Sequence, residues 1–99
     1  MKNPFEHLDK MLEHRLRLQI MSVLVTNNMF DFITLKEILG VTDGNLASHI
    51  KALEKEKYVS VSKSFVDRKP NTKYKITERG KTAFRKHIDA LEAVLKQTK

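Results

Sequence analysis

The chain has 99 residues, of which 40% are hydrophobic and 31% charged, and these values are typical of a single soluble globular domain. It contains no cysteine, which excludes disulfides, thiolate zinc sites and thiol redox chemistry. No apolar run approaches the roughly 20 residues that a membrane helix needs, and the N-terminus lacks the apolar stretch of a secretory signal. We therefore expect a cytoplasmic protein that does not enter a membrane.

The net charge of +7 is concentrated in the second half of the chain. Residues 1–50 carry five Lys and Arg against six Asp and Glu, a net −1, whereas residues 51–99 carry fourteen against six, a net +8. Nine of the basic residues lie within 63–86, together with only two acidic ones. Such a local excess favours a polyanionic partner. Charge alone does not distinguish DNA from RNA or from an anionic membrane surface.

The N-terminal quarter predicts one helix. Asn3–Glu6 has the spacing of a helix start with a proline at the first position, and apolar residues then recur at helical spacing between Leu8 and Leu24. We expect this helix to run from about Pro4 to Thr26, with an irregularity near Glu13–Arg15. Asn27-Asn28 would end it, because Asn tolerates the left-handed conformation.

Two short helices are predicted next, after a brief extended segment at residues 30–33. Thr34 and Glu37 have capping-box spacing, and Gly40 closes the helix that they begin. Thr42 then caps a helix at about residues 42–57, in which Leu46, Ile50 and Leu53 recur at i, i+4 and i+7 and form one apolar stripe. Two helices joined by a turn of two to three residues are the helix-turn-helix arrangement.

Beyond Lys57 the apolar period changes from helical to alternating. Residues 58–62 and 73–76 predict two strands, separated by a basic, turn-forming loop at 67–71, so that about 58–76 form a hairpin wing. Thr77 can cap a last helix at about 77–97. On that helix four apolar residues follow a 4-3-4 spacing, which is the spacing of a heptad-like seam: Phe84, Ile88, Leu91 and Leu95.

The face of helix 42–57 opposite its apolar stripe suits contact with DNA. It carries small or polar residues (Gly44, Asn45, Ser48, Lys51, Ala52 and Lys55). Small residues allow the backbone to approach DNA, while Asn and Ser form hydrogen bonds with base edges or phosphates. Asp43 is the one member whose charge opposes the DNA backbone. At the wing, Arg68 and Lys69 would reach the minor groove or its phosphates, and Lys63, Lys73 and Lys75 line the hairpin.

The sequence also resembles a known family over about Leu8 to Leu95. The segments LDKMLEHRLRLQIMSVL, FITLKEILGVTDGNLASHIKALEKEKYV and KSFVDRKPNTKYKITERGKTAFRKH are similar to small stand-alone winged-helix transcriptional regulators of prokaryotes, which are relatives of the MarR and ArsR regulators. The most specific parts are Thr42–Leu46 with Ser48-His49, and Thr72-x-Tyr74-x-Ile76-Thr77-x-x-Gly80. The resemblance implies a homodimer held by the first and last helices.

One residue departs from the family pattern. The family usually has Gly before the residue that starts the wing, and Lys57 occupies that position here. A left-handed conformation at Lys57 would cost about 1 kcal/mol.

Two sets of site residues follow. The residues expected to contact DNA are Thr42, Gly44, Asn45, Ser48, His49, Lys51, Lys55, Arg68, Lys69 and Lys73. Those expected at a dimer interface are Leu8, Leu12, Phe84, Ile88, Leu91 and Leu95. Two alternatives stay open at this point. His49 suits a packing role as well as a DNA contact, and the seam on the last helix suits packing within one chain as well as a dimer.

No catalytic, metal or cofactor site is expected. The sequence has no Gly-rich phosphate loop, no HExxH motif and no cysteine nucleophile, and its four histidines are scattered. We therefore predict a single α+β domain over residues 1–99: a winged helix-turn-helix with a three-helix core, a two-stranded wing and a C-terminal dimerisation helix. The predicted function is sequence-specific binding of double-stranded DNA as a homodimeric transcriptional regulator. The alternative is a winged-helix module for protein–protein interaction, and no small-molecule effector is assigned.

Overall fold

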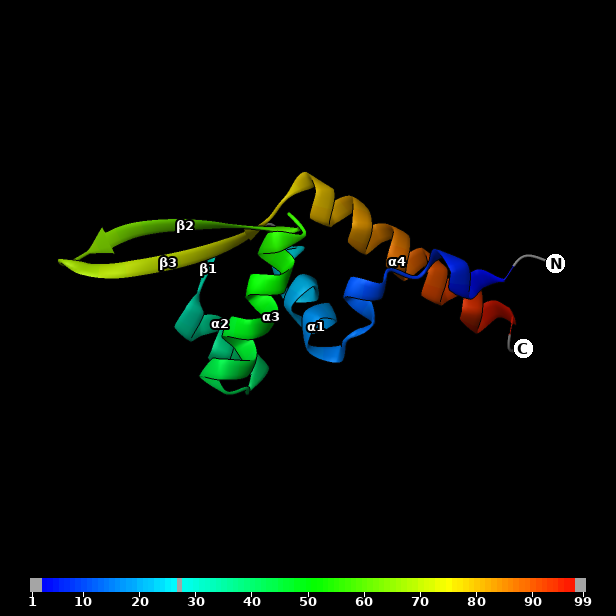
Figure 1. Ribbon diagram of the computed structural model, residues 1–99, viewed down its shortest axis with the longest axis horizontal. Helices are drawn as coiled ribbons and strands as arrows, with labels where there is room; N and C mark the ends of the chain where they lie inside the picture. The colour runs from blue at the N-terminus through cyan, green and yellow to red at the C-terminus, as the bar shows by residue number, and fades with distance from the viewer. Residues whose placement is uncertain (1–2, 27, 98–99) are drawn as a thin grey trace.

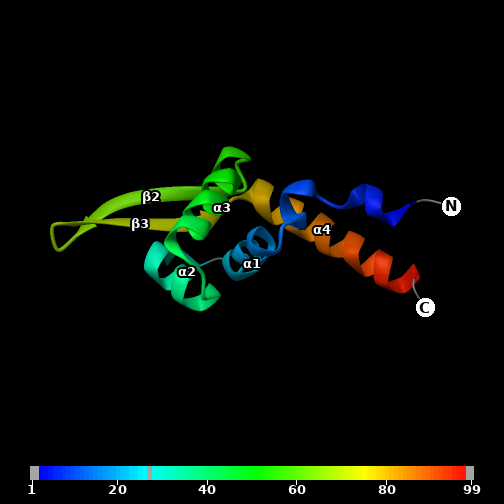
Figure 2. The ribbon, with the colours of Figure 1, turned by 60° about the horizontal axis from the view of Figure 1, so that its bottom comes forward.

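The computed structural model describes residues 3–26 and 28–97 and measures 58 × 25 × 21 Å. In chain order the elements are the 3-10 helices η1 (Pro4–His7) and η2 (Lys10–Glu13), α1 (Arg15–Leu24), β1 (Phe30–Asp31), α2 (Phe32–Leu39), α3 (Asp43–Lys55), β2 (Val59–Val66), β3 (Lys69–Ile76) and α4 (Glu78–Gln97). The β2–β3 hairpin projects at one end of the molecule, and α4 with the N-terminal segment forms the other end (Figure 1). Helices α1, α2 and α3 lie between them, as the turned view also shows (Figure 2).

The expectation of one continuous N-terminal helix is wrong, but the irregularity expected near Glu13–Arg15 is confirmed by the break at His14. The backbone is extended at Asp9 and His14, and each of these side chains caps a new helix by accepting a backbone N–H, from Met11 (2.9 Å) and from Leu16 (3.1 Å). Local side-chain caps of this kind compete with helix continuation. The breaks let the N-terminal segment turn back along α4. Helix α1 ends at Leu24, and Asn27, which was expected to end the helix, lies outside the described residues.

The second helix begins earlier than Thr34. Asp31 is its cap, and its carboxylate accepts the Thr34 backbone N–H at 2.8 Å. Hydrogen bonds from Thr34 also hold the pKa of Asp31 below its usual value. The expected extended segment is the short strand β1, which pairs antiparallel with Tyr74 and Lys73 and adds a third strand to the sheet.

The turn and the second helix of the helix-turn-helix agree with the sequence. Gly40 ends α2 in the left-handed conformation (φ 63°), and the Thr42 hydroxyl accepts the Asn45 backbone N–H at 3.3 Å. The apolar stripe of α3 is buried against α1. It forms part of a hydrophobic core that consists of these residues: Leu12, Leu16, Ile20, Met21, Leu24, Leu35, Leu46, Ile50, Leu53, Tyr58, Val59, Tyr74 and Ile76.

The hairpin is longer than expected, with eight residues in each strand and a sheet order of β1-β3-β2. The predicted loop at 67–71 is wrong, since the turn consists of Asp67 and Arg68 alone and Val66 pairs with Lys69. Both turn residues have positive φ (51° and 65°), which is the backbone of the two-residue hairpin turn that matches strand twist. Pro70 is tolerated within β3 because β1 pairs only with residues further along that strand.

Three residues hold the base of the wing. Lys57 and Thr77 lie just before and just after the hairpin, and Gly80 lies in α4. Lys57 adopts the left-handed conformation (φ 64°) that its place in the pattern suggested. Thr77 donates its hydroxyl proton to the Lys57 carbonyl at 2.7 Å and accepts the Gly80 backbone N–H at 2.9 Å, so it caps α4 as expected. Gly80 packs so closely that an added Cβ would lie 2.2 Å from the Tyr58 carbonyl oxygen.

Candidate nucleic-acid interface

Helix α3 presents an exposed side opposite its buried stripe. The predicted contact residues Thr42, Gly44, Asn45, Ser48, Lys51 and Lys55 are all exposed. Ser48, Lys51 and Lys55 line one shallow hollow there, while Asn45 lines a neighbouring one with His49. A Cβ added to Gly44 would meet no atom within 4 Å, so the backbone there is open to a close approach. Contact of these residues with DNA stays a prediction.

The charge of Asp43, which opposes a DNA backbone, is paired within the chain. Its carboxylate lies 2.7 Å from the Lys36 ammonium group, and this ion pair joins α3 to α2. Both side chains are substantially exposed, so the pair adds less than about 1 kcal/mol to stability. Its main effect is to lower the negative potential at the N-terminus of α3.

His49 packs within the chain. It is half-buried, its ring centroid lies 4.1 Å from that of His14, and its Nδ1 is 3.3 Å from the Arg17 guanidinium. Burial, followed by the positive charges of His14 and Arg17, lowers its pKa. Of the two roles that the sequence left open, the structure shows the packing role, in which His49 joins α3 to the N-terminus of α1.

The wing hairpin has two chemically different faces, because directly opposed residues of the two strands share a face. The first face runs from the core to the tip and consists of Val59, Val61, Lys63 and Phe65 with Pro70, Thr72, Tyr74 and Ile76. The second face consists of Ser60, Ser62, Ser64 and Val66 with Lys69, Asn71, Lys73 and Lys75. Lys69, Lys73 and Lys75 thus lie together on a serine-lined surface, whereas Lys63 lies on the other side, a separation that the sequence prediction did not make.

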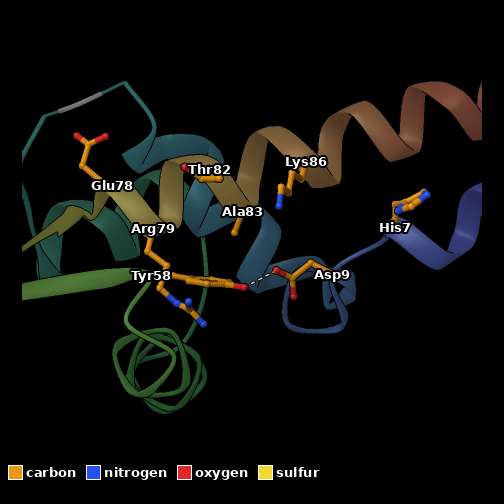
Figure 3. A pocket seen from close by; sticks show the side chains of 8 residues that line it. All are labelled: His7, Asp9, Tyr58, Glu78, Arg79, Thr82, Ala83 and Lys86. Atoms are coloured by element: carbon orange, nitrogen blue, oxygen red, sulfur yellow. Dashed lines mark hydrogen bonds between the residues drawn. The ribbon is translucent and has the colours of Figure 1, made fainter.

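A cleft of about 550 Å³ lies where the N-terminal segment, α4 and the base of the wing meet (Figure 3). The Tyr58 hydroxyl donates to an Asp9 carboxylate oxygen at 2.5 Å, and the Asp9 backbone N–H donates to His87 Nδ1 at 3.0 Å. Burial, followed by the bond to Asp9, raises the pKa of Tyr58 to about 12. The Arg79 guanidinium lies 5.6 Å from the Tyr58 ring centroid.

These contacts join the N-terminal segment to α4 and to the base of the wing. No sequence signal pointed to them, because the partners are 49 and 78 residues apart.

The residues predicted at a dimer interface separate into three groups by burial. Leu12 is fully buried in the core of its own chain, so its assignment to a dimer interface is corrected: the side chain is not available to a partner in this arrangement. Leu8, Phe84 and Leu91 are partly buried, and Phe84 packs against the same core. Ile88 and Leu95 are exposed on α4, by 37% and 68%.

In residues 3–26 and 28–97, no three His, Asp or Glu side chains are grouped so that they could hold a metal ion. No helix in the same residues combines the length and the apolar character needed to cross a membrane.

Comparison with known proteins gives one consistent result. Residues 16–95 match the model of a family described as winged helix DNA-binding domain. An uncharacterized protein of Methanocaldococcus jannaschii is 37% identical over 79 residues, which cover 80% of this chain and 86% of that protein. The structure of a transcriptional regulator homologue from Pyrococcus horikoshii OT3 is similar with a TM-score of 0.83 at 33% identity, covering 89% of this chain and 87% of that one. A protein assigned to the MarR family in Porphyromonas gingivalis W83 has the same fold, with a TM-score of 0.68 at 16% identity over 88% of this chain and 80% of that one.

Proposed function

This chain belongs to the winged helix DNA-binding domain family, and from that membership we propose how it acts as a DNA-binding transcriptional regulator. Two copies bind a two-fold DNA site in the cytoplasm. Each α3 enters a major groove, and each β2–β3 hairpin lies on the adjacent backbone or minor groove. Half-site centres are then about one helical turn, roughly 34 Å, apart. The proposal involves no catalytic step.

The observation that supports this function best is the pairing of two exposed surfaces. Helix α3 offers Asn45 and Ser48 on an open polar face, and the neighbouring hairpin carries five basic residues against one acidic residue. Base edges are read through hydrogen bonds of fixed geometry, while phosphates attract positive charge from any direction. We therefore assign sequence preference to α3 and most of the affinity to the hairpin.

The homodimer rests on the end of the molecule away from the hairpin. Phe5, on the N-terminal segment, and Ile88, on α4, are exposed there by 58% and 37%. Burying such side chains against a second copy removes apolar surface from water. We expect Ile88→Glu to give a monomer by light scattering, whereas Glu92→Gln, a nearby change of an exposed polar residue, leaves the dimer intact. A persistent Ile88→Glu dimer would exclude this seam.

The direct test of DNA binding is its dependence on salt. The full chain is titrated into fluorescently labelled duplexes with a random core, between 50 and 300 mM NaCl. Release of counterions from Z phosphates gives a slope of log K against log[salt] of about −0.9Z, and we expect at least five phosphate contacts. An RNA duplex of the same length, whose A-form geometry closes the major groove to α3, should bind more weakly. No binding, or a flat salt response, contradicts the proposal.

One observation favours a second function, in which the hairpin binds another protein. Phe65, close to the hairpin tip, is 76% exposed, and exposed aromatic residues are common at protein interfaces. The same salt titration separates the two functions, since a protein-binding module does not release counterions from a duplex.

A further inference from the structure

Phe65 has an unusual place in the structure. At 76% exposure it is the most exposed large hydrophobic side chain among the described residues. It lies one residue pair before the turn, directly opposite Pro70, and the pair Val66↔Lys69 closes the strands beyond it. Phe65 and Pro70 are therefore the outermost pair of the hairpin face that begins in the core with Val59 and Ile76.

Packing within the chain does not account for this side chain. The hairpin face is covered by the helices only near its base, where Val59, Tyr74 and Ile76 are buried. The outer half extends beyond α2 and α3 in both views (Figures 1 and 2). The pairing with Pro70 covers only part of the ring, which stays 76% exposed. An exposed Phe on a projecting strand is an aggregation hazard.

The surroundings of Phe65 indicate the chemistry of its partner. Lys63 precedes Phe65 on the same face, Arg68 lies in the turn beyond it, and Lys69 lies beside it on the opposite face. Asp67 is the only acidic residue in the hairpin. An apolar group flanked by cations matches the DNA minor groove, where phosphates border a channel of sugar and base edges. Proteins that bend DNA insert Phe, Leu, Ile, Met or Pro side chains there, between base steps.

The turn at the tip is the shortest that joins two strands. Asp67 and Arg68 both have the positive φ of the two-residue turn that matches the strand twist. Together with the fixed ring of Pro70, the short turn leaves the tip little freedom to lose on binding.

We propose that Phe65, supported across the strands by Pro70, is a minor-groove wedge that opens a base step and bends the bound DNA, while Arg68 and Lys69 hold the flanking phosphates. The inference rests on the proposed DNA-binding function and adds to it a deformation of the DNA. It also explains why an apolar pair sits at the end of the most basic element of the chain.

The experiment uses the full chain and a duplex selected by the wild type from a pool with a random 30-bp core. Dyes at the duplex ends report bending by energy transfer, and 2-aminopurine placed along the duplex reports opening of a base step. The variants are Phe65→Ala, Phe65→Leu and the control Val66→Ala. The control truncates a neighbouring apolar side chain on the opposite face of the hairpin. Circular dichroism confirms that each variant is folded.

Phe65→Ala should weaken binding about tenfold, since the apolar contact is lost, and should remove most of a bend of about 20° or more. The salt slope and the selected consensus should not change. Phe65→Leu, which keeps an apolar wedge, should retain the bend, and Val66→Ala should match the wild type. An unchanged bend and aminopurine signal in Phe65→Ala overturn the wedge while leaving DNA binding in place.

Two further outcomes also overturn the wedge. If Phe65→Ala leaves DNA binding intact but abolishes self-association in sedimentation, the occupant of the tip is a second copy of this chain. If the wild type selects no duplex at all, the proposed function fails first, and this result differs from a duplex that is bound but straight.

Discussion

Helix α3 and the β2–β3 hairpin both present exposed polar side chains, but the chain supports them in different ways. Helix α3 is packed along its length, with a buried stripe, a capped N-terminus and an ion pair to α2. The hairpin is anchored only at its base and is exposed over its outer half. The helix carries two lysines on its outer face, whereas the hairpin carries five basic residues.

The difference indicates what each region contributes. Hydrogen bonding to base edges needs donors and acceptors at fixed positions, and a packed helix provides them. Attraction to phosphates needs charge that reaches the backbone, and an extended hairpin provides it. Variants in one region, with the other region as the reference, separate the two contributions.

The largest effect is expected from the charges of the hairpin. Replacing Arg68, Lys69 and Lys73 by Ala removes three phosphate contacts, so the salt slope should become shallower by about 2.7 and affinity at 100 mM salt should fall about a hundredfold or more. The control replaces Lys10, Lys81 and Lys96, away from the hairpin, and alters the net charge equally. Equal losses in the two variants would mean that only total charge matters. Fluorescence anisotropy measures both quantities.

Two glycines allow the wing base and α3 to be compared. Gly80 lies in tight packing at the base of the wing, and Gly44 lies in open space on α3. Gly80→Ala forces a Cβ against the Tyr58 carbonyl, and we expect the free energy of unfolding in urea to fall by about 2–3 kcal/mol. Gly44→Ala meets no atom, so stability should rise by up to about 1 kcal/mol. Because the added methyl group lies on the exposed side of α3 that we propose contacts DNA, this variant should still bind DNA more weakly. A stable Gly80→Ala protein would refute the tight packing at the wing base.

Tyr58 links the base of the hairpin to the N-terminal segment. Its pKa is raised to about 12 from a usual value of 10.0, so the folded state keeps the proton that the unfolded state releases. The stability from this group is therefore complete below pH 10 and is lost as the pH rises towards 12. Tyr58→Phe should cost about 1–2 kcal/mol at neutral pH, because the bond to Asp9 is lost. The free energy of unfolding of the Tyr58→Phe variant should also fall less between pH 10 and 12 than that of the wild type. Identical alkaline profiles would exclude the Tyr58–Asp9 bond as their cause.

The smallest effects concern two of the three left-handed residues of the wing, Lys57 at its base and Arg68 at its tip. Lys57→Gly and Arg68→Gly both relieve a positive φ, and each should raise the free energy of unfolding by about 0.5 kcal/mol after the entropy of the added glycine is deducted. Their effects on DNA should differ. Arg68→Gly should weaken binding because a tip charge is lost, whereas Lys57→Gly at the base should leave it nearly unchanged. Equal affinities would remove Arg68 from the contact surface.

The helix-turn-helix was predictable because its signals are local. Gly40, Thr42 and the i, i+4, i+7 stripe of α3 each act within a few residues, and the structure contains all three features. The start of α2 was misplaced because two residues, Asp31 and Thr34, compete as caps, and Asp31 takes the role. The exposed residues of α3 followed from the helical period alone.

The remaining features depend on contacts that are distant in the sequence. The N-terminal segment follows α4 because Asp9 meets His87 and Tyr58, and no periodicity encodes that meeting. His49 was undecided for the same reason, since its partners lie on or before α1. The hairpin turn was misplaced because Pro70 resembles a turn residue, whereas the pairing of the strands confines the turn to Asp67 and Arg68.

The division between α3 and the hairpin is tested most directly by parallel selections from one random duplex pool. The wild type, Asn45→Ala and the Arg68, Lys69, Lys73 triple-alanine variant are selected under the same salt, and each consensus and affinity is measured. We expect Asn45→Ala to give a more degenerate consensus with nearly unchanged affinity for random DNA. The triple variant should keep the wild-type consensus in the α3 half-sites and lose affinity for every duplex. A wild-type consensus from Asn45→Ala, together with a degenerate one from the triple variant, would show that α3 does not set the sequence preference.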